Sequence, residues 1–370
     1  MTELLTIDGS HGEGGGQILR TAVTLSALTG RPIRIGNIRA GRPRPGLAAQ
    51  HLTAIRAVAK LCHARINGDA LGSQQIDFIP GARAVAGHYR FDVATAREGG
   101  SAGSACLVLQ TLVPPLALAP GKSRLSIRGG THMAWSPSFD YIRDVWLPAI
   151  RQTGISASAA LRAWGWYPIG QGEIDVEVSG LDPGRRCPVK PLNLVERGRL
   201  RTISGRGVAA NLPSQIAERM VARAEALLSD MGAEMRIEPI RVGAACAGAG
   251  LFLTAEYEHV HCGFTALGKR GKPAEQVADE AAGSLKEHWR SGEALDRHLA
   301  DQILVPLTLA SGLSRFSTER ISRHLRTNAW VVERFGLARV DFDCRKEDGG
   351  LVTVVPEAAV IKALVPHLHR

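Results

Sequence analysis

The sequence has no apolar run near the 18 or so residues that a membrane helix needs, and its N-terminus lacks a basic stretch followed by an apolar one. Its six cysteines are scattered and form no CxxC pair. These absences predict neither a membrane span nor a secretory signal, and they argue against a zinc site and a disulfide framework. We therefore expect a cytoplasmic protein with reduced thiols.

Aromatic residues make up only 5% of the chain, which argues against an extended surface for stacking single-stranded bases. Acidic residues are also few, 35 against 45 Lys and Arg, and the net charge is +10. A polyanion is the natural partner of such a chain, because the arginines that supply most of the positive charge match phosphate well. A bias toward Arg and Ala with no ligand behind it is the alternative.

Glycine, by contrast, is abundant in one stretch, GEGGGQILR at residues 12–20. The apolar run before it predicts a strand, and the pattern after it predicts a helix that ends at Gly30. Glycines at such a turn let the backbone approach a ligand, and a helix N-terminus attracts phosphate. The stretch lacks the Gly-Lys-Ser/Thr of a P-loop and the third glycine of a dinucleotide fingerprint, so a simple turn is the competing interpretation.

Three segments share the order apolar helix, glycine and strand, and in the first two a glycine turn precedes the helix. They span residues 14–38, 99–130 and 298–322, and each carries one glutamine in its helix. These glutamines are Gln17, Gln110 and Gln302. The pattern predicts an α+β (α/β) fold in which three βαβαββ-type units, each a small sheet with helices on one face, form a large domain.

Residues 184–272 interrupt the repeat and predict a small inserted α/β domain. The large domain then comprises residues 1–183, with two units and part of the third, and residues 273–370, which complete the third. Within the insertion we expect a helix at 213–231, strands near 200–204, 235–239 and 251–256, and a flexible loop at 243–250. Elsewhere we expect helices at 47–62, 138–153 and 273–290, and a helix through residue 302 that continues to Leu309.

A cationic loop, RAGRPRPGL at residues 39–47, joins the first repeat strand to the next helix. Prolines and glycines hold its three arginines, which limits the conformational entropy lost on binding phosphate. Gln50 and His51 follow one turn later and are expected to face the same space. A solvated loop is the alternative interpretation.

His324 lies between Arg323 and Arg326 near the end of the chain. Neighbouring cations lower the pKa of an imidazole and keep it neutral, as a nucleophile requires. Most histidines are structural or surface residues, so this position alone does not establish catalysis. The turn GGTHMAWSP at residues 129–137 is a further candidate for a ligand loop, because it follows a strand end.

Together these segments resemble the RNA 3'-terminal phosphate cyclase family over essentially the full chain. Six ordered blocks carry the resemblance: residues 12–20, residues 39–52, residues 101–104 with Gln110, residues 129–137, residues 299–302, and His324 with Thr327-Asn328. The resemblance implies repeats related to the C-terminal domain of a translation initiation factor, with a small inserted domain.

The resemblance also implies an ATP-dependent, ligase-class reaction in RNA processing. ATP adenylylates a histidine and releases pyrophosphate, and AMP then passes to an RNA 3'-phosphate to give an RNA(3')pp(5')A end. The neighbouring 2'-OH attacks that phosphorus, expels AMP and leaves a 2',3'-cyclic phosphate. The implied partners are RNA with a 3'-terminal phosphate, ATP, and a divalent metal, Mg or Mn. No membrane partner is expected.

Residue by residue, the resemblance assigns a nucleophile, a metal ligand and two binding groups. His324 is the implied nucleophile, and Glu13 is the implied metal ligand, since hard cations prefer carboxylate oxygen. The residues implied in phosphate or RNA binding are Arg20, Arg39, Arg42, Gln50 and His51. The residues implied in ATP binding are Gln17, Gln110, Pro137, His298, Leu299, Ala300, Asp301 and Gln302.

One position departs from the family pattern: His298 stands where bacterial members carry tyrosine. Histidine still stacks on adenine but offers a smaller face, so the departure bears on ATP affinity and nucleotide choice. The resemblance gives no role to Trp135. The oligomeric state does not follow from the sequence, and a homodimer is one arrangement that it allows.

Two other classes of protein compete with this interpretation. A non-catalytic, cyclase-like RNA-binding protein of ribosome assembly shares the resemblance, but such relatives lack the nucleophilic histidine that His324 supplies here. An enolpyruvyl transferase shares the repeat architecture, but those chains are longer, with six repeats in two similar halves, and they lack the block around His324.

Overall fold

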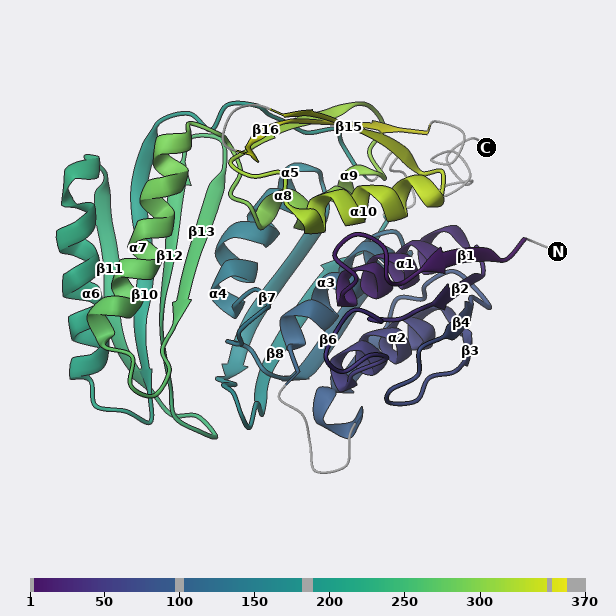
Figure 1. The fold of residues 1–370 in the computed structure, drawn as a ribbon, viewed down its shortest axis with the longest axis horizontal. Helices are drawn as coiled ribbons and strands as arrows, with labels where there is room; N and C mark the ends of the chain where they lie inside the picture. The colour runs from purple at the N-terminus through teal and green to yellow at the C-terminus, as the bar shows by residue number, and fades with distance from the viewer. Residues whose placement is uncertain (1–2, 97–102, 182–188, 345–347, 358–370) are drawn as a thin grey trace.

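The computed structural model describes residues 3–96, 103–181, 189–344 and 348–357. Four mixed sheets of four strands each lie within these residues, and helices pack between and against them (Figure 1). The mixed α/β character that the sequence predicts is therefore confirmed. No helix in the described part of the chain is both long enough and apolar enough to cross a membrane.

The first sheet, in the order β1-β2-β4-β3, packs with α1, and α2 packs against α1. Its elements are β1 (Leu5–Asp8), α1 (Gly16–Thr29), β2 (Ile33–Gly36), α2 (Ala49–Cys62), β3 (Arg65–Asn67) and β4 (Ile76–Ile79). Helix α1 ends as predicted at Gly30, which takes the left-handed φ of 71° that favours glycine and donates its N–H to the carbonyl of Ser26.

The second and third sheets repeat this pairing pattern. The second, β5-β6-β8-β7, contains β5 (His88–Asp92), η1 (Val93–Ala96), α3 (Ala105–Ala117), β6 (Lys122–Gly129), α4 (Phe139–Tyr141), the π-turn η2 (Ile142–Trp146), α5 (Leu147–Gln152), β7 (Ser156–Ala163) and β8 (Gly172–Ser179). The third, β9-β14-β16-β15, contains β9 (Asn193–Leu194), α8 (Leu299–Gln302), α9 (Leu304–Leu307), β14 (Ser314–Thr318), α10 (Arg323–Arg334), β15 (Ala338–Cys344) and β16 (Gly350–Pro356). In all three sheets the first two strands pair in parallel and the remaining pairs are antiparallel.

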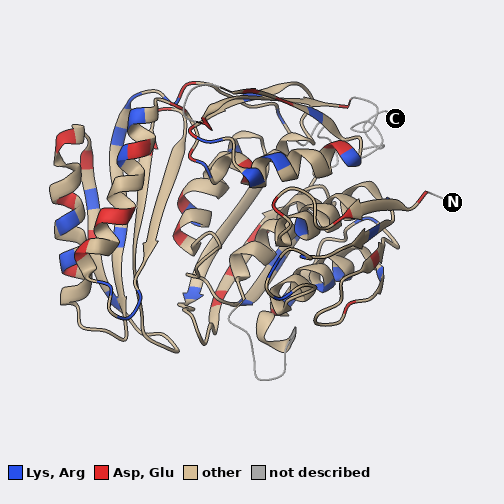
Figure 2. Ribbon diagram, viewed as in Figure 1, with Lys and Arg blue, Asp and Glu red and all other residues tan. Residues whose placement is uncertain are grey.

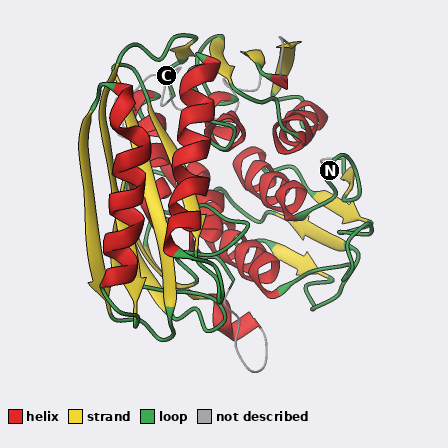
Figure 3. Cartoon of the chain, turned by 60° about the vertical axis from the view of Figure 1, so that its left-hand side comes forward, coloured by secondary structure: helices red, strands yellow, loops and turns green. Residues whose placement is uncertain are grey.

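The fourth sheet, β11-β10-β12-β13, is covered on one face by two long helices (Figure 3). Its elements are β10 (Leu200–Ala210), α6 (Gln215–Leu228), η3 (Ser229–Met231), β11 (Glu234–Val242), β12 (Gly248–Tyr257), β13 (His261–Leu267) and α7 (Ala274–Ser291). Both helices carry acidic and basic side chains, as Figure 2 shows, and ion pairs such as Arg219–Glu275 at 2.7 Å join them. Because this pair is exposed, it contributes little stability.

The expectation of a flexible loop through residue 250 is wrong in its last part. Strand β12 begins at Gly248, which pairs with Ala210 of β10. A side chain at position 248 would meet the indole of Trp166, so glycine is required for this close approach. Gly248, one of the small residues that suggested a loop, instead makes room for the indole ring of Trp166. Strand β13, which the sequence analysis did not predict, completes the sheet.

The helix expected to continue from residue 302 to Leu309 is broken into α8 and α9 at Ile303. Pro306 has no N–H to donate to the carbonyl of Gln302, four residues earlier. The indole Nε1 of Trp146 donates to that carbonyl instead, at 3.2 Å. Trp146 thus satisfies the backbone group that the proline leaves unpaired.

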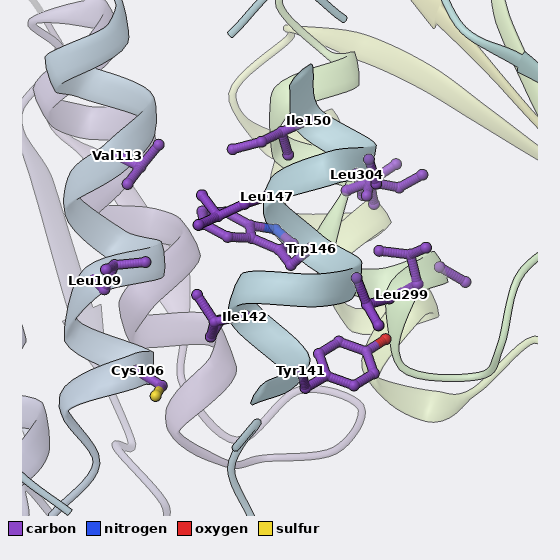
Figure 4. Packing of buried hydrophobic residues seen from close by; sticks show 14 of the residues in the cluster. Cys106, Leu109, Val113, Tyr141, Ile142, Trp146, Leu147, Ile150, Leu299 and Leu304 are labelled. Carbon is purple, nitrogen blue, oxygen red and sulfur yellow. The ribbon is translucent and has the colours of Figure 1, made fainter. Parts of the chain in front are cut away.

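Apolar side chains from α3, η2, α5, α8 and α9 form a shared core between the second and third sheets (Figure 4). Leu109 and Val113 of α3 face Ile142 and Leu147, while Leu299 lies beyond Trp146 on the other side. All six are buried. This packing fixes α3 and α8 relative to each other, and both helices carry predicted site residues.

Candidate active site

The glycine turn before α1 lies against α10, although the two segments come from opposite ends of the chain (Figure 1). The backbone N–H of Glu13 donates to Oγ1 of Thr327 at 3.1 Å. Gly12 has a φ of 60°, and a Cβ there would lie 2.5 Å from the same hydroxyl. Glycine at position 12 is therefore required for the turn to reach α10.

This contact brings Glu13 beside His324. The carboxylate Oε2 of Glu13 lies 3.7 Å from Nδ1 of His324, and its Oε1 pairs with the guanidinium of Arg42. Oε2 is buried and has no hydrogen-bond partner. His324 is the second residue of α10, whose first turn is capped by Ser322, with the hydroxyl accepting from the N–H of Leu325 at 3.1 Å.

The electrostatic surroundings of His324 disfavour its charged form. Partial burial lowers the pKa of the imidazole below its usual 6.5, and the positive charge of Arg20, then of His298 and Arg42, lowers it further. Its side chain is still 49% exposed, so the ring can be reached from outside. A neutral, accessible ring nitrogen can act as a nucleophile.

The three repeat glutamines lie at one polar pocket between α1, α3, η2, α8 and α9. Gln110 Nε2 donates to Gln302 Oε1 at 2.5 Å, and Arg20 Nη2 donates to Gln17 Oε1 at 2.6 Å. The full lining comprises Gln17, Arg20, Thr21, Thr24, Gln110, Thr111, Pro114, Trp146, Asp301, Gln302, Val305 and Pro306. The helices of all three predicted repeats therefore contribute to one pocket.

Two half-buried ionisable groups, Asp301 and Arg20, face this pocket. Burial raises the pKa of Asp301 from 3.8 to about 8, with a further rise from Asp296, and the positive charge of Arg20 offsets only part of it. Burial likewise lowers the pKa of Arg20 to about 10, against the opposing effect of Asp301. Asp301 Oδ1 is buried without a hydrogen-bond partner, so it is available to a polar ligand.

The predicted phosphate-binding residues of the first sheet lie close to α1. His51 is buried, its Nδ1 accepts from the N–H of Ala48 at 3.1 Å, and its ring occupies the space that a side chain on Gly16 would need. Burial, helped by Arg20 and Arg39, lowers its pKa to about 3 and keeps it neutral. Nδ1 accepts a hydrogen bond, so the proton resides on Nε2.

Arg39 and Gln50 each have a structural partner in addition to any ligand. The guanidinium of Arg39 donates to the carbonyl of Gly46 at 2.9 Å, which closes the cationic loop. Gln50 Oε1 accepts from the N–H of Ser104 at 3.4 Å and so joins the first and second sheets. Ser104 belongs to the block at residues 101–104 that the resemblance singled out; residues 101 and 102 of that block lie outside the described residues.

Four predicted ATP-binding residues do not line the polar pocket. Leu299 and Ala300 are fully buried in the core. His298 is exposed, and its backbone N–H donates to Asp296 Oδ1 at 2.9 Å. Pro137 lies in the loop between β6 and α4. Of the predicted set, Gln17, Gln110, Asp301 and Gln302 meet in the pocket.

Several residues that complete the site were given no role from sequence. Thr327 holds Glu13, Thr21 donates to Oδ1 of Asn328 at 2.7 Å, and Asn328 Nδ2 donates to the carbonyl of Asp301 at 3.1 Å. Thr327 and Asn328 lie three and four residues after His324, the helical spacing that places them beside it. That spacing was the signal available in the sequence. Trp146 gave no comparable signal, because its role depends on a proline in another helix.

The donor set fits a divalent metal shared with a phosphate ligand. No group of three or more His, Cys, Asp or Glu residues able to hold a metal ion occurs among the described residues. Magnesium is commonly held by one or two carboxylates with substrate phosphates and water. The buried, unpartnered Oε2 of Glu13 is suited to be the single protein ligand of such a shared ion.

The family model and the curated relatives of this chain agree with one another. A family model described as RNA 3'-terminal phosphate cyclase matches residues 11–342. This chain is 59% identical to a Methylococcus capsulatus protein named RNA 3'-terminal phosphate cyclase, over 95% of this chain and 96% of the relative. It is 49% identical to a protein of the same name from Nostoc sp., over 91% of this chain and 95% of that relative. The protein of that name from Salmonella typhimurium is 41% identical, covering 96% of this chain and 100% of the relative.

Among solved structures, the enolpyruvyl transferase NikO from Streptomyces tendae matches 48% of this chain and 33% of its own, with 16% identity and a TM-score of 0.26. A likeness of that extent supports no conclusion. The family model covers most of the chain, and the named relatives match it nearly end to end. The chain therefore belongs to the RNA 3'-terminal phosphate cyclase family, a family of enzymes.

Proposed function

We propose that this enzyme uses ATP to convert an RNA 3'-terminal phosphate into a 2',3'-cyclic phosphate through two covalent intermediates. A ring nitrogen of His324 attacks the α-phosphorus of ATP, a P–N bond forms, and pyrophosphate leaves. An oxygen of the RNA 3'-phosphate then attacks the same phosphorus and releases His324, which gives RNA(3')pp(5')A. Finally the neighbouring 2'-OH attacks the 3'-phosphorus and loses its proton as AMP leaves.

The observation that carries this proposal is the meeting of His324 with Glu13 at 3.7 Å beside Arg42 and Arg20. A neutral imidazole is the reactive form, and the site keeps it neutral. We assign neutralisation of the triphosphate or the RNA phosphate to Arg20, Arg39 and Arg42, since charge builds on phosphate oxygens during transfer.

Glu13 would hold the divalent metal, Mg or Mn. When bound, the metal would withdraw charge from the phosphate oxygens of ATP. Gln17, Gln50 and His51 would orient phosphate or the terminal ribose. The adenosine would lie with Gln110, Asp301 and Gln302, and with Pro137 and His298 toward the exterior. Leu299 and Ala300 are buried in the core, so their contribution to ATP binding would be to hold α8, which carries Asp301 and Gln302, in place.

The finer architecture is part of the proposal. We interpret the first three sheets as copies of one unit, like the C-terminal domain of a translation initiation factor, because their strands follow the order first, second, fourth and third, which the fourth sheet does not share. The insertion in the third copy, expected at residues 184–272 between residues 1–183 and 273–370, would consist of the fourth sheet with α6 and α7. It would start after β9, which pairs with β14 of the third sheet, and would include α7, which packs on β12 and β13. We place the reaction in the cytoplasm, and a homodimer is the assembly to test first.

The non-catalytic alternative, a cyclase-like RNA-binding protein of ribosome assembly, is disfavoured. Such a protein needs no nucleophile, yet the surroundings of His324 lower its pKa and leave half of its side chain accessible. Binding without catalysis also gives no reason for an unpartnered carboxylate oxygen facing that ring.

Labelling with α-³²P ATP tests the proposal. Wild type should form a covalent, acid-labile adduct with metal present and should cyclise RNA 3'-phosphate ends. His324→Ala should abolish both, while the control His259→Ala, an exposed histidine in the turn between β12 and β13, should retain both. If wild type takes no label and leaves RNA ends uncyclised, the proposal is wrong.

A further inference from the structure

His11, the residue before the glycine turn, makes a second contact with α10, next to the one that Glu13 makes with Thr327. The ring of His11 stacks on the indole of Trp330, with centroids 3.9 Å apart and planes at 15°. His11 is otherwise exposed, and Trp330 is half-buried on the second turn of α10. Aromatic pairs with this geometry contribute beyond their buried area.

The spacing of the contacts gives them a common effect. His324, Thr327 and Trp330 follow one another at three-residue intervals, so they are neighbours along α10. The turn runs alongside in the opposite direction: His11 lies at Trp330, and Glu13 lies at Thr327 and His324. A slide of the turn along α10 would therefore move the Glu13 carboxylate relative to the imidazole.

The turn has little internal stiffness to resist such a slide. Gly12 and Gly14 both have φ near 60°, and glycine has the greatest backbone freedom of any residue. Its local bonds, such as the N–H of Gly14 to the carbonyl of His11 at 3.0 Å, close the turn on itself without fixing it to α10. On α10, the Thr327 hydroxyl and the Trp330 ring provide that fixation.

We propose that His11 and Trp330 are positioning residues that set the register of the glycine turn on α10 and thereby hold Glu13 opposite His324. Neither ring touches a reacting atom in this assignment, and neither lines the polar pocket. The inference rests on the proposed nucleophile and metal ligand. It predicts an effect on the rate of histidine adenylylation and little effect on ATP affinity.

Single-turnover adenylylation with α-³²P ATP tests this inference. At saturating ATP, His11→Ala and Trp330→Ala should each slow adduct formation by about 3- to 10-fold, the range expected from losing one aromatic pair. The ATP concentration for half-maximal rate should change less than about two-fold, because the pocket residues remain. The double variant should be no slower than the slower single variant, since both remove one interaction.

Conservative and remote variants separate positioning from general destabilisation. His11→Phe keeps a ring and should restore most of the rate. His88→Ala and Trp289→Ala, at exposed positions on β5 and α7, should match wild type. Because His11 is exposed, its truncation opens no core cavity, and this variant decides the test even if Trp330→Ala folds poorly.

The outcomes also separate this inference from the reaction itself. If wild type forms no adduct, the proposed function fails first. If wild type forms the adduct and His11→Ala forms it at the same rate, the positioning role is wrong while the reaction stands. Additive losses in the double variant would likewise overturn the inference.

Discussion

Gln110 on α3 donates to Gln302 on α8 at 2.5 Å, so two glutamines that the sequence places in separate repeats meet side chain to side chain. Arg20 and Gln17, from the first repeat, line the same pocket. A site assembled from three segments in this way depends on the packing between them. That packing is supplied by the apolar core around Trp146.

Replacing Glu13 should separate the chemistry from RNA binding. Glu13→Ala removes the proposed metal ligand, and we expect adenylylation of His324 to slow by about 100-fold or more, the scale seen when one electrostatic catalytic group is lost. Binding of RNA with a 3'-phosphate should change by less than about two-fold, because removing a carboxylate does not weaken attraction for phosphate. Adduct labelling and fluorescence anisotropy measure the two effects.

The control for this prediction is Glu238→Ala, an exposed carboxylate on β11, which should change neither quantity. Equal losses of adenylylation and RNA binding in Glu13→Ala would reject the metal role.

Asp301 should make the protein less stable as the pH rises. Its folded pKa of about 8 exceeds the ordinary 3.8, so the folded chain keeps a proton that the unfolded chain has lost. The stabilisation is fully present below about pH 4 and is lost as the pH rises through about 8, by at most about 1.4 kcal/mol per pH unit. Asp301→Asn removes this loss, so its free energy of unfolding should fall less between about pH 5 and about pH 8.

Urea denaturation at the two pH values measures the difference. Asp343→Asn, at an exposed position on β15, is the control and should follow wild type. If wild type and Asp301→Asn show the same pH dependence, Asp301 is charged in the folded protein at neutral pH.

Trp146 and Pro306 should be energetically coupled through the carbonyl of Gln302. Trp146→Phe removes the donor and leaves that buried carbonyl unpaired, which should lower the free energy of unfolding by about 1–3 kcal/mol in addition to the loss from the smaller ring. Pro306→Ala restores an N–H four residues after Gln302. It should recover part of the loss in Trp146→Phe and give less benefit in wild type.

Denaturation of the four proteins in this double-mutant cycle measures the coupling. Identical effects of Pro306→Ala in both backgrounds would show that the indole does not replace the missing backbone donor.

Much of the fold follows from local patterns in the sequence. The glycine turn, the helix ending at Gly30 and the strand Ser314–Thr318 were predictable because each depends on nearby residues. The break at Ile303 was not predictable. The sequence shows Pro306, but it does not show that the distant indole of Trp146 donates to the carbonyl of Gln302. The start of β12 was missed because its glycine requirement comes from Trp166, far away in sequence.

The candidate site likewise has features that the local sequence shows and features that depend on tertiary packing. Residue types such as His324 among arginines and Glu13 among glycines can be selected as candidates from the sequence alone. The burial of the Asp301 Oδ1 atom and the contact from Thr327 to Glu13 arise only when helices from different repeats pack. A stacked pair such as His11 and Trp330 has no local signature at all, because neither residue is unusual in its own segment.

The contact between Glu13 and Thr327 joins positions 314 residues apart in the chain. During synthesis at roughly 5–20 residues per second, the glycine turn leaves the ribosome about 15 seconds to one minute before α10 exists. A nascent or truncated polypeptide that ends before α10 contains the whole first sheet but neither Thr327 nor the proposed nucleophile His324. The glycine turn therefore has no partner for the Glu13 backbone until α10 has been synthesised, so the site geometry described above is assembled only after that helix has emerged.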